Sequence, residues 1–377
     1  MFIKGVGMTK FSIEDNTSNH LVYEAALEAL DDAGNSMNDI DAVVLSNNDL
    51  LSNGERQRHG SSLLSSLFQK KMPIISVPAG CAGGGTALWT AMRLQRSSSY
   101  NKLLVIGFEK MVANVSKKVT DEMLMGTERI YEQTEGMNFP AENALVAQQY
   151  MLKYGATLDD FALVAYKNHQ NAFLNPKARF YNKKVTLKQI KNSPVVASPL
   201  RLFDCSIPAN GASAIVLSKN EGDVKITGSA EESDYLAPFE RDDATTWDST
   251  IKAAAEAYKQ AGITPEDVDI AEIHDAFTSV ELISYEDLGF CRKGEGKELI
   301  RKAATSINGK LPVNTSGGLK AKGHPISATG ISQVYELVKQ MRKQAGKRQV
   351  DNVECGLAQN IGGAGSSVTV HILRKVR

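Results

Sequence analysis

The sequence has few cysteines, few aromatic residues, no excess charge and no long apolar run. It holds 43 Lys and Arg residues against 43 Asp and Glu residues, so it offers no broad cationic face to a nucleic-acid backbone. Its longest apolar stretches, such as residues 103–108, are as long as a strand and far short of the ~20 residues that cross a bilayer. We expect a soluble protein with neither a nucleic-acid nor a membrane partner.

Metal and nucleotide motifs are also missing. The 4 cysteines show neither the CxxC spacing of a zinc site nor the regular spacing of a disulfide scaffold. There is no HExxH and no Asp-rich calcium loop, and the glycine clusters match neither the dinucleotide fingerprint nor the P-loop. The first residues lack the apolar core of a signal peptide. We expect a cytoplasmic protein with no metal and no tightly bound cofactor, and hydride transfer has little support.

An internal repeat organises the chain. Residues 25–41 (AALEALDDAGNSMNDID) recur as residues 253–269 (AAAEAYKQAGITPEDVD), with about half of the positions identical. Each copy predicts a helix that ends at a left-handed glycine, followed by an apolar strand. A strand ending in glycine precedes each copy, at residues 3–5 and 226–228. The repeat therefore predicts two α/β halves with largely parallel sheets covered by helices.

A polar, helix-rich region without a counterpart in the second half lies at roughly residues 112–218, and it ends in a predicted apolar strand at residues 212–217. We predict an N-terminal half of residues 1–111 plus 212–222, an insertion of residues 112–211 and a C-terminal half of residues 223–377. The basic residues of the insertion are interpreted as an ordinary solvated face. They are Lys117, Lys118, Arg179, Lys183 and Lys184.

Cys81 is the first candidate for chemistry. The segment of residues 74–89 predicts a strand, a tight turn at Gly80 and then a helix. Backbone N–H groups and the helix dipole at a helix start favour a thiolate, so the thiol of Cys81 would be unusually reactive. The alternative is a buried structural cysteine in a glycine-rich helix, and this segment alone does not decide between the two.

Two histidines favour a reactive Cys81. His274 follows the strand of the second repeat at the position that Ser46 holds in the first, and open α/β sheets bind ligands at the carboxyl ends of their strands. His324 lies in a glycine-rich turn before a helix predicted to begin near Ala328. A lone loop histidine is more often a surface residue, but such a side chain can also face a pocket.

The glycine-rich turn of residues 362–365 offers backbone N–H groups for an oxyanion hole or forms a tight hairpin, and taken alone the hairpin is favoured. The remaining histidines have no comparable setting and are predicted to be structural or surface residues. They are His20, His59, His169 and His371.

The combination resembles the thiolase superfamily, and the resemblance covers the whole chain. It rests on a cysteine at a helix start in the first half and on three motifs in the second: HDAF at residues 274–277, GHP at 323–325 and NIGGAG at 360–365. The branch most similar to the chain is that of sterol-carrier-protein-2-like thiolases, and within it the stand-alone archaeal acetoacetyl-CoA thiolases. That likeness rests on GFEKM, NHQNA, NP and SPLR, at residues 107–111, 168–172, 175–176 and 198–201.

The resemblance implies an α/β thiolase fold, duplicated and five-layered (α-β-α-β-α), with a loop-domain insertion that binds acyl-CoA. It implies a homodimer or dimer of dimers that condenses two acetyl-CoA reversibly, with coenzyme A and acetyl-CoA as substrates, in lipid or isoprenoid metabolism such as the mevalonate pathway. The archaeal relatives imply a complex with 3-hydroxy-3-methylglutaryl-CoA synthase and a small zinc-containing OB-fold protein.

The resemblance also assigns roles to residues. Cys81 matches the acylated nucleophile, and His324 matches the histidine that activates this thiol and helps bind the thioester oxygen. His274 stands where other thiolases have the Asn of an NEAF motif. The backbone N–H groups of Cys81 and Gly362 match a second oxyanion hole.

The chain departs from the family at the group that removes the α-proton. Many thiolases use a second cysteine in a CxG motif, where this chain has Asn360, and the branch often has a cysteine where this chain has Ala276. An asparagine side chain cannot act as a base. We predict that His274 or His324 is the base, with Cys291 as a weaker candidate.

Two other functions stay open. The first is an irreversible condensing enzyme, such as a 3-hydroxy-3-methylglutaryl-CoA synthase or a ketoacyl synthase of the third type, which normally lacks a GHP motif of this form. The second is a non-catalytic acyl-CoA-binding protein or scaffold, suggested by the two missing cysteines; the intact Cys81 argues against it. A further departure, Asn210 in place of the usual Asp, is expected to affect loop packing more than chemistry.

Overall fold

The computed structural model describes residues 1–48, 50, 53–97, 99–112 and 124–376, and the fold and site are given for these residues. The main sheet has nine strands in the order β3-β2-β4-β7-β1-β8-β11-β10-β9. Their bounds are β1 Phe2–Met8, β2 Ala42–Ser46, β3 Ile74–Ser76, β4 Lys102–Lys110, β7 Asn210–Ser218, β8 Val224–Ser233, β9 Ile270–Glu272, β10 Cys355–Gly362 and β11 Ser367–Lys375.

The expectation of largely parallel sheets is wrong. Only β2 with β3, β2 with β4, and β9 with β10 are parallel in this sheet as described. The other neighbouring strands are antiparallel. Strand β7 follows the insertion and β11 follows a hairpin, and both are antiparallel to their neighbours. The helical crossovers of the repeat do not determine the direction of these two strands.

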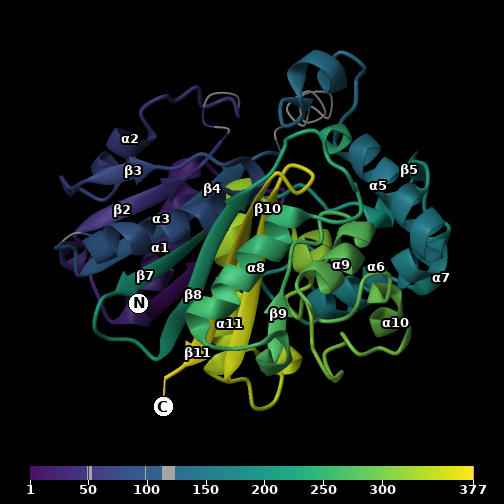
Figure 1. Ribbon diagram of the computed structural model, residues 1–377. Coiled ribbons are helices and arrows are strands. Elements are labelled where there is room, and N and C mark those ends of the chain that lie inside the picture. Colours follow the sequence, from purple (N-terminus) through teal and green to yellow (C-terminus); the bar gives the residue numbers. More distant parts are fainter. Residues whose placement is uncertain (49, 51–52, 98, 113–123, 377) are drawn as a thin grey trace.

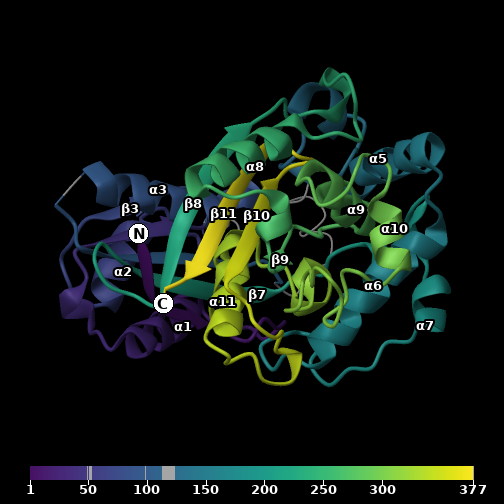
Figure 2. The same cartoon turned by 60° about the horizontal axis from the view of Figure 1, so that its bottom comes forward.

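Helices arrange the two halves in five layers. Helix α1 (Ser18–Ala33) covers β1, β4 and β7, and α8 (Asp248–Ala261) covers β8 and β11. Between the halves lie α3 (Gly83–Ser97) and α11 (Thr329–Met341), which contact each other and strands of both halves. Figures 1 and 2 show the first half in purple and blue beside the green and yellow strands of the second. This packing agrees with the five-layered arrangement expected from the resemblance.

The predicted repeat is confirmed in its local structure. Helices α1 and α8 end at Gly34 and Gly262, whose φ angles of 61° and 64° are left-handed, and each helix is followed by a strand, β2 or β9. A residue with a Cβ is strained in this conformation, so glycine fixes where each helix stops.

The insertion packs on the second half although it follows β4 of the first. It contains α5 (Phe139–Tyr154), α6 (Leu158–Phe173), α7 (Leu187–Lys191), β5 (Val195–Ala197) and β6 (Leu200–Arg201). Helices α5 and α6 contact α9 (Thr278–Asp287), and α6 also contacts α10 (Gly296–Arg301). The right-hand side of Figure 1 shows these helices together. Another helix, α2 (Gly60–Leu67), lies against β3.

The solvated face proposed for the insertion is correct for only some of its basic residues. Lys183 and Lys184 are exposed, whereas Arg179 is partly buried and donates to the Pro208 carbonyl. Lys117 and Lys118 lie outside the described residues. Among the described residues, no helix is long and apolar enough to cross a membrane.

Candidate active site

A cavity of about 330 Å³ brings Cys81, His274 and His324 together. Both halves and the insertion contribute to its wall, which is mainly apolar. Its apolar lining includes Met111, Phe139, Trp247, Phe277, Val280 and Ile361. The volume is at the small end of the range for ligand sites in proteins, which fits a short substrate group.

Cys81 lies in a 3-10 turn, Gly80–Ala82, directly before α3, and Gly80 has a φ of 52°. The turn and helix start predicted from the sequence are therefore confirmed. A Cβ on Gly84 would lie 2.7 Å from the Ser327 carbonyl oxygen and 2.8 Å from the Gly330 nitrogen. Only glycine permits this approach, which brings the start of α3 against the segment that follows His324.

Asn360 on β10 fixes the start of α3. Its Oδ1 accepts from the backbone N–H of Gly85 at 3.1 Å, and its Nδ2 donates to the Cys81 carbonyl at 2.9 Å. Because one partner can only donate and the other can only accept, the orientation of the amide is determined. Asn360 thus caps α3 from a distant strand, and both of its polar atoms are occupied.

The ring of His274 is a hydrogen-bond donor toward the cavity. Its Nδ1 lies 3.3 Å from the Ile361 backbone nitrogen and 3.3 Å from Nδ2 of Asn360. Both of these groups donate, so Nδ1 is the unprotonated nitrogen and the proton of the neutral ring is on Nε2. His274 can therefore donate Nε2–H to a ligand oxygen.

The ring of His324 has the opposite tautomer. Its Nδ1 lies 2.7 Å from the hydroxyl of Thr329, and that hydroxyl donates its proton to the Pro325 carbonyl at 3.0 Å. The hydroxyl oxygen must then accept from His324, so Nδ1 carries the proton and Nε2 is unprotonated and able to accept a hydrogen bond. His324 can accept the proton of a thiol.

Both histidines are neutral at pH 7. Burial lowers the pKa of His324 to about 3, and the nearby Lys322 lowers it further. Burial, followed by the proximity of His324, holds the pKa of His274 well below its usual 6.5. The two ring centres are 5.4 Å apart at an angle of 87°. The site therefore presents one neutral donor and one neutral acceptor side by side.

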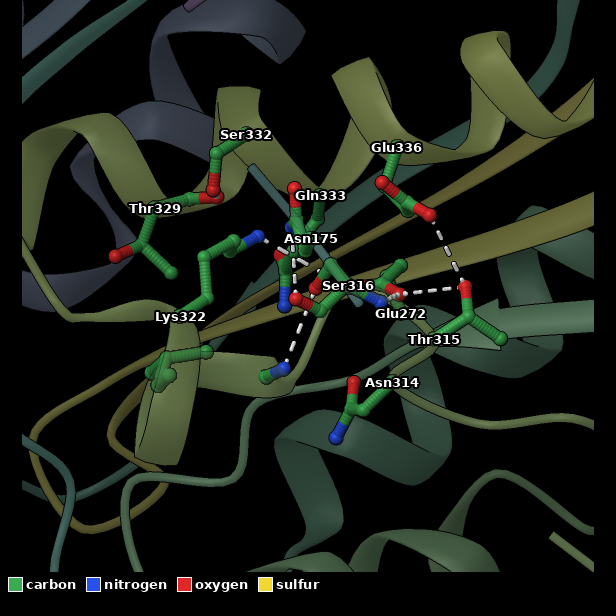
Figure 3. A network of polar contacts seen from close by, with 12 residues as sticks. Asn175, Glu272, Asn314, Thr315, Ser316, Lys322, Thr329, Ser332, Gln333 and Glu336 are labelled. Atoms are coloured by element: carbon green, nitrogen blue, oxygen red, sulfur yellow. Dashed lines mark hydrogen bonds and ion pairs between the residues drawn. The ribbon is translucent and has the colours of Figure 1, made fainter. Parts of the chain in front are cut away.

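A buried polar network connects the two segments that carry His274 and His324. Glu272 precedes His274 by two residues, Lys322 precedes His324 by two, and their charged groups lie 4.0 Å apart. Ser316 donates its backbone N–H and its hydroxyl to Glu272. Figure 3 shows the network continuing through Thr315 to Glu336, which pairs with Arg348 at 2.9 Å. The network ties the strand that leads to His274 to the turn that carries His324.

Comparisons with known proteins identify the family. The N-terminal thiolase domain model matches residues 3–199, and the thiolase C-terminal domain-like model matches residues 230–375. The chain belongs to the thiolase family. It is 40% identical to an acetyl-CoA acetyltransferase of Methanothermobacter thermautotrophicus over 98% of both chains. It is 32% identical to sterol carrier protein 2 of Bos taurus, over 98% of this chain and 71% of that protein. These matches confirm the resemblance inferred from the motifs.

A solved structure described as an Ltp2-ChsH2(DUF35) aldolase is also similar to this thiolase-family chain. It has a TM-score of 0.85 and 28% sequence identity, over 100% of this chain and 98% of the other.

The structure gathers the residues chosen from the sequence. Gly362 ends β10, and a Cβ there would lie 3.2 Å from the Ala82 nitrogen, so the backbone of Gly362 lies against the turn of Cys81. The residues after Gly362 form the predicted hairpin to β11. Cys291, in contrast, does not line the cavity, and burial raises the pKa of its thiol to about 12.

The predictions for the other four histidines and for Asn210 are confirmed. His20 and His59 are exposed; His169 packs against two phenylalanine rings and His371 bonds the Ser229 hydroxyl, so both are structural. Asn210 holds loop backbone, accepting from the Val112 N–H at 2.8 Å and donating to the Glu14 carbonyl at 3.0 Å. A cluster of side chains able to hold a metal ion is absent from the described ranges.

Three residues at or beside the cavity have little or no signal in the sequence. Thr329 sets the tautomer of His324, Cys205 lines the cavity, and Asn143 lines it with an Oδ1 that has no hydrogen-bond partner in the described structure. Cys205 follows the SPLR segment by a few residues, so proximity to a family motif was the only available signal. Asn143, inside α5, gave no signal.

Proposed function

We propose that this protein catalyses the reversible condensation of two acetyl-CoA molecules to acetoacetyl-CoA and coenzyme A through an acyl-Cys81 intermediate. The observation that carries the proposal is the pairing of Cys81 with two neutral histidines of opposite tautomer in one cavity. The name of the Methanothermobacter relative, acetyl-CoA acetyltransferase, supports the acetyl group as substrate.

The tautomers assign a role to each group. His324 accepts the thiol proton of Cys81 at Nε2, and the thiolate attacks the thioester carbonyl. His274 donates Nε2–H to a substrate oxygen, and the backbone N–H groups of Cys81 and Gly362 hold the negative oxygen of the acyl-Cys81 adduct. Because both histidines are neutral before the reaction, the charges that must be stabilised are the imidazolium formed on His324 and the negative charge that passes from the Cys81 thiolate to the substrate oxygen.

The two alternative functions predict other results. An irreversible condensing enzyme would form acyl-Cys81 but would not cleave acetoacetyl-CoA with coenzyme A. A non-catalytic acyl-CoA-binding protein would bind the thioester without forming the adduct. An acyl-cysteine that turns over in both directions is specific to the thiolase reaction.

The assembly and compartment are part of the same proposal. We propose a homodimer or dimer of dimers that joins 3-hydroxy-3-methylglutaryl-CoA synthase and a zinc-containing OB-fold protein in the cytoplasm, with a role in the mevalonate pathway. The naming of a second component, ChsH2(DUF35), in the similar aldolase structure supports a multi-protein assembly. Cys205, Cys291 and Cys355 are free thiols among the described residues, in keeping with a reducing compartment. Light scattering of the pure protein and native co-purification test these assignments.

The deciding experiment incubates the purified protein with acetoacetyl-CoA and coenzyme A. We expect loss of the β-ketothioester, formation of acetyl-CoA and an acetyl adduct on Cys81 by intact mass, none of which Cys81→Ala shows. Cleavage by Cys81→Ala at the wild-type rate would refute the proposal. Absence of both cleavage and adduct in the wild-type protein would favour the non-catalytic alternative.

A further inference from the structure

Condensation and cleavage both need a group that exchanges a proton with the α-carbon of acetyl-CoA. Of the described residues that line the cavity, those with a thiol or imidazole that can exchange a proton are Cys81, Cys205, His274 and His324. Cys81 carries the acyl group when the α-proton is transferred, so it is not available. This inference rests on the proposed function and concerns which of the other three acts.

The hydrogen bonds of the two histidines leave neither free for this step. His274 already holds a proton on Nε2, and its Nδ1 receives two donors. His324 can accept at Nε2, but there it holds the proton taken from Cys81. Asn360, which replaces a cysteine of many relatives, has both polar atoms bound to the backbone of α3 and its preceding turn.

Cys205 lies between the backbone segments that carry the two histidines. It forms a β-bridge with Phe277, and the next residue, Ser206, donates its N–H to the Ala276 carbonyl at 2.7 Å. On the other side, the N–H of His324 donates to the Ile207 carbonyl at 2.9 Å. The short segment after Cys205 is therefore fixed to both walls of the site.

The thiol of Cys205 is protonated at neutral pH. Its Sγ donates to the Arg201 carbonyl at 3.5 Å, which requires a proton on sulfur. Burial raises the pKa of this thiol to about 11, an effect that the charge of Lys320 partly offsets. A protonated thiol facing a substrate cavity is suited to donate a proton to a carbanion.

The same cavity carries an independent sign of a ligand. Asn143 is 3% exposed and lines the cavity, and its Oδ1 has no partner in the described structure. A buried acceptor of this kind costs free energy unless a donor reaches it, and an amide N–H of a bound thioester would supply one. The cavity that Cys205 faces thus contains a buried acceptor, Oδ1 of Asn143, to which a bound substrate can donate a hydrogen bond.

We propose that Cys205 is the acid and base of the α-carbon. In cleavage, the thiolate of Cys81 attacks the ketone carbon of acetoacetyl-CoA, the bond between C2 and C3 breaks, and its electrons form the enolate of acetyl-CoA. Cys205 gives its S–H proton to the enolate carbon and becomes a thiolate. Coenzyme A then gives its thiol proton to Cys205 and attacks the acetyl group, and Cys81 leaves and regains its proton from His324.

Condensation follows the same steps in reverse. Acetyl-CoA acylates Cys81, and the departing coenzyme A takes the proton of Cys205. The resulting thiolate takes the α-proton of the second acetyl-CoA, and the enolate attacks acetyl-Cys81. Protons balance over the cycle, and no other reactant is needed.

The test separates acylation from proton transfer. Wild type, Cys205→Ala and Cys205→Ser are incubated with acetyl-CoA in D₂O, and we measure both the acetyl adduct on Cys81 and deuterium entry into the methyl group of acetyl-CoA. Both variants are expected to form the adduct, more slowly than wild type, because coenzyme A can leave as a thiolate without the proton of Cys205. Deuterium entry and acetoacetyl-CoA cleavage are expected to fall by about 10²-fold or more, as is usual when a general acid or base is removed. Cys291→Ala is the matched control, because Cys291 is also partly buried but lies outside the cavity lining.

The outcomes are distinct. Deuterium entry in Cys205→Ala within threefold of wild type would overturn the role of Cys205 and leave the proposed function intact. A loss in Cys291→Ala equal to that in Cys205→Ala would also overturn it. If both Cys205 variants fold by circular dichroism but form no adduct, the thiol is essential to acylation and its assignment to the α-carbon is wrong. A wild-type protein that forms no adduct would refute the proposed function, and this inference with it.

Discussion

The replacement Asn360→Cys restores the second cysteine that many thiolases have, and we expect it to weaken the protein rather than to improve catalysis. Asn360 caps α3 through the buried N–H of Gly85 and holds the Cys81 carbonyl. A thiol is a weak donor and acceptor and cannot replace both bonds.

The cost follows from the groups that lose their partners. The N–H of Gly85 is buried and left unsatisfied, which costs about 1–3 kcal/mol, and the partly buried Cys81 carbonyl adds about 1 kcal/mol. His274 keeps its bond from the Ile361 N–H, so its tautomer is unchanged. We therefore expect unfolding to be easier by about 2–4 kcal/mol. The start of α3 is also released, so acetylation of Cys81 is expected to be slower.

Urea unfolding followed by circular dichroism measures the stability, and intact mass after a short pulse of acetyl-CoA measures acetylation. Asn38→Cys is the control, because it introduces a cysteine at an exposed position. The reasoning is refuted if Asn360→Cys unfolds within 0.5 kcal/mol of wild type (about the scatter of neutral surface changes). It is equally refuted if this variant exchanges α-protons faster than wild type does.

Three further predictions concern the surroundings of the site. Thr329→Val removes the acceptor of the His324 Nδ1–H, a bond worth about 1.5–3 kcal/mol once the ring is charged, so pulse acetylation is expected to slow by roughly 10–10²-fold. Lys322→Met leaves the Glu272 carboxylate buried without its cation and is expected to cost about 3–5 kcal/mol in urea unfolding at pH 8. Burial raises the pKa of Glu272 to about 7, so the native state binds a proton as the pH falls through 7 and the cost should be smaller at pH 5.5. Gly84→Ala gains up to about 1 kcal/mol of helix propensity but overpacks backbone at a cost of about 1–3 kcal/mol, so calorimetry is expected to show a lower melting temperature.

Each of these has a result that would contradict it. Thr329→Ser keeps the hydroxyl and should acetylate at nearly the wild-type rate; if it fails like Thr329→Val, packing rather than the hydrogen bond is responsible. Lys183→Met is the exposed control for Lys322→Met, and a loss at pH 5.5 as large as at pH 8 would exclude Glu272 as the cause. A Gly84→Ala protein with a higher melting temperature than wild type would show that α3 and α11 can move apart.

Much of this protein was determined by local sequence. Gly34 and Gly262 mark the ends of the repeated helices because only glycine adopts the left-handed conformation there without strain. Gly80 similarly allows the turn that places Cys81 before α3. These features depend on a few neighbouring residues, and the same is true of the motifs that carried the family resemblance.

The tertiary structure alone decided the strand directions and the chemistry of the side chains. The sheet is mostly antiparallel because β7 follows an insertion and β11 follows a hairpin. The sequence repeat does not specify the direction of either strand. The bond from Asn360 to Cys81 joins residues 279 positions apart, and the segment after Cys205 meets both histidine-bearing segments only in the fold. A tautomer depends on which donors surround a ring, and a thiol's acidity depends on its burial. Sequence neighbours specify neither, because both are set by groups that folding brings from distant parts of the chain.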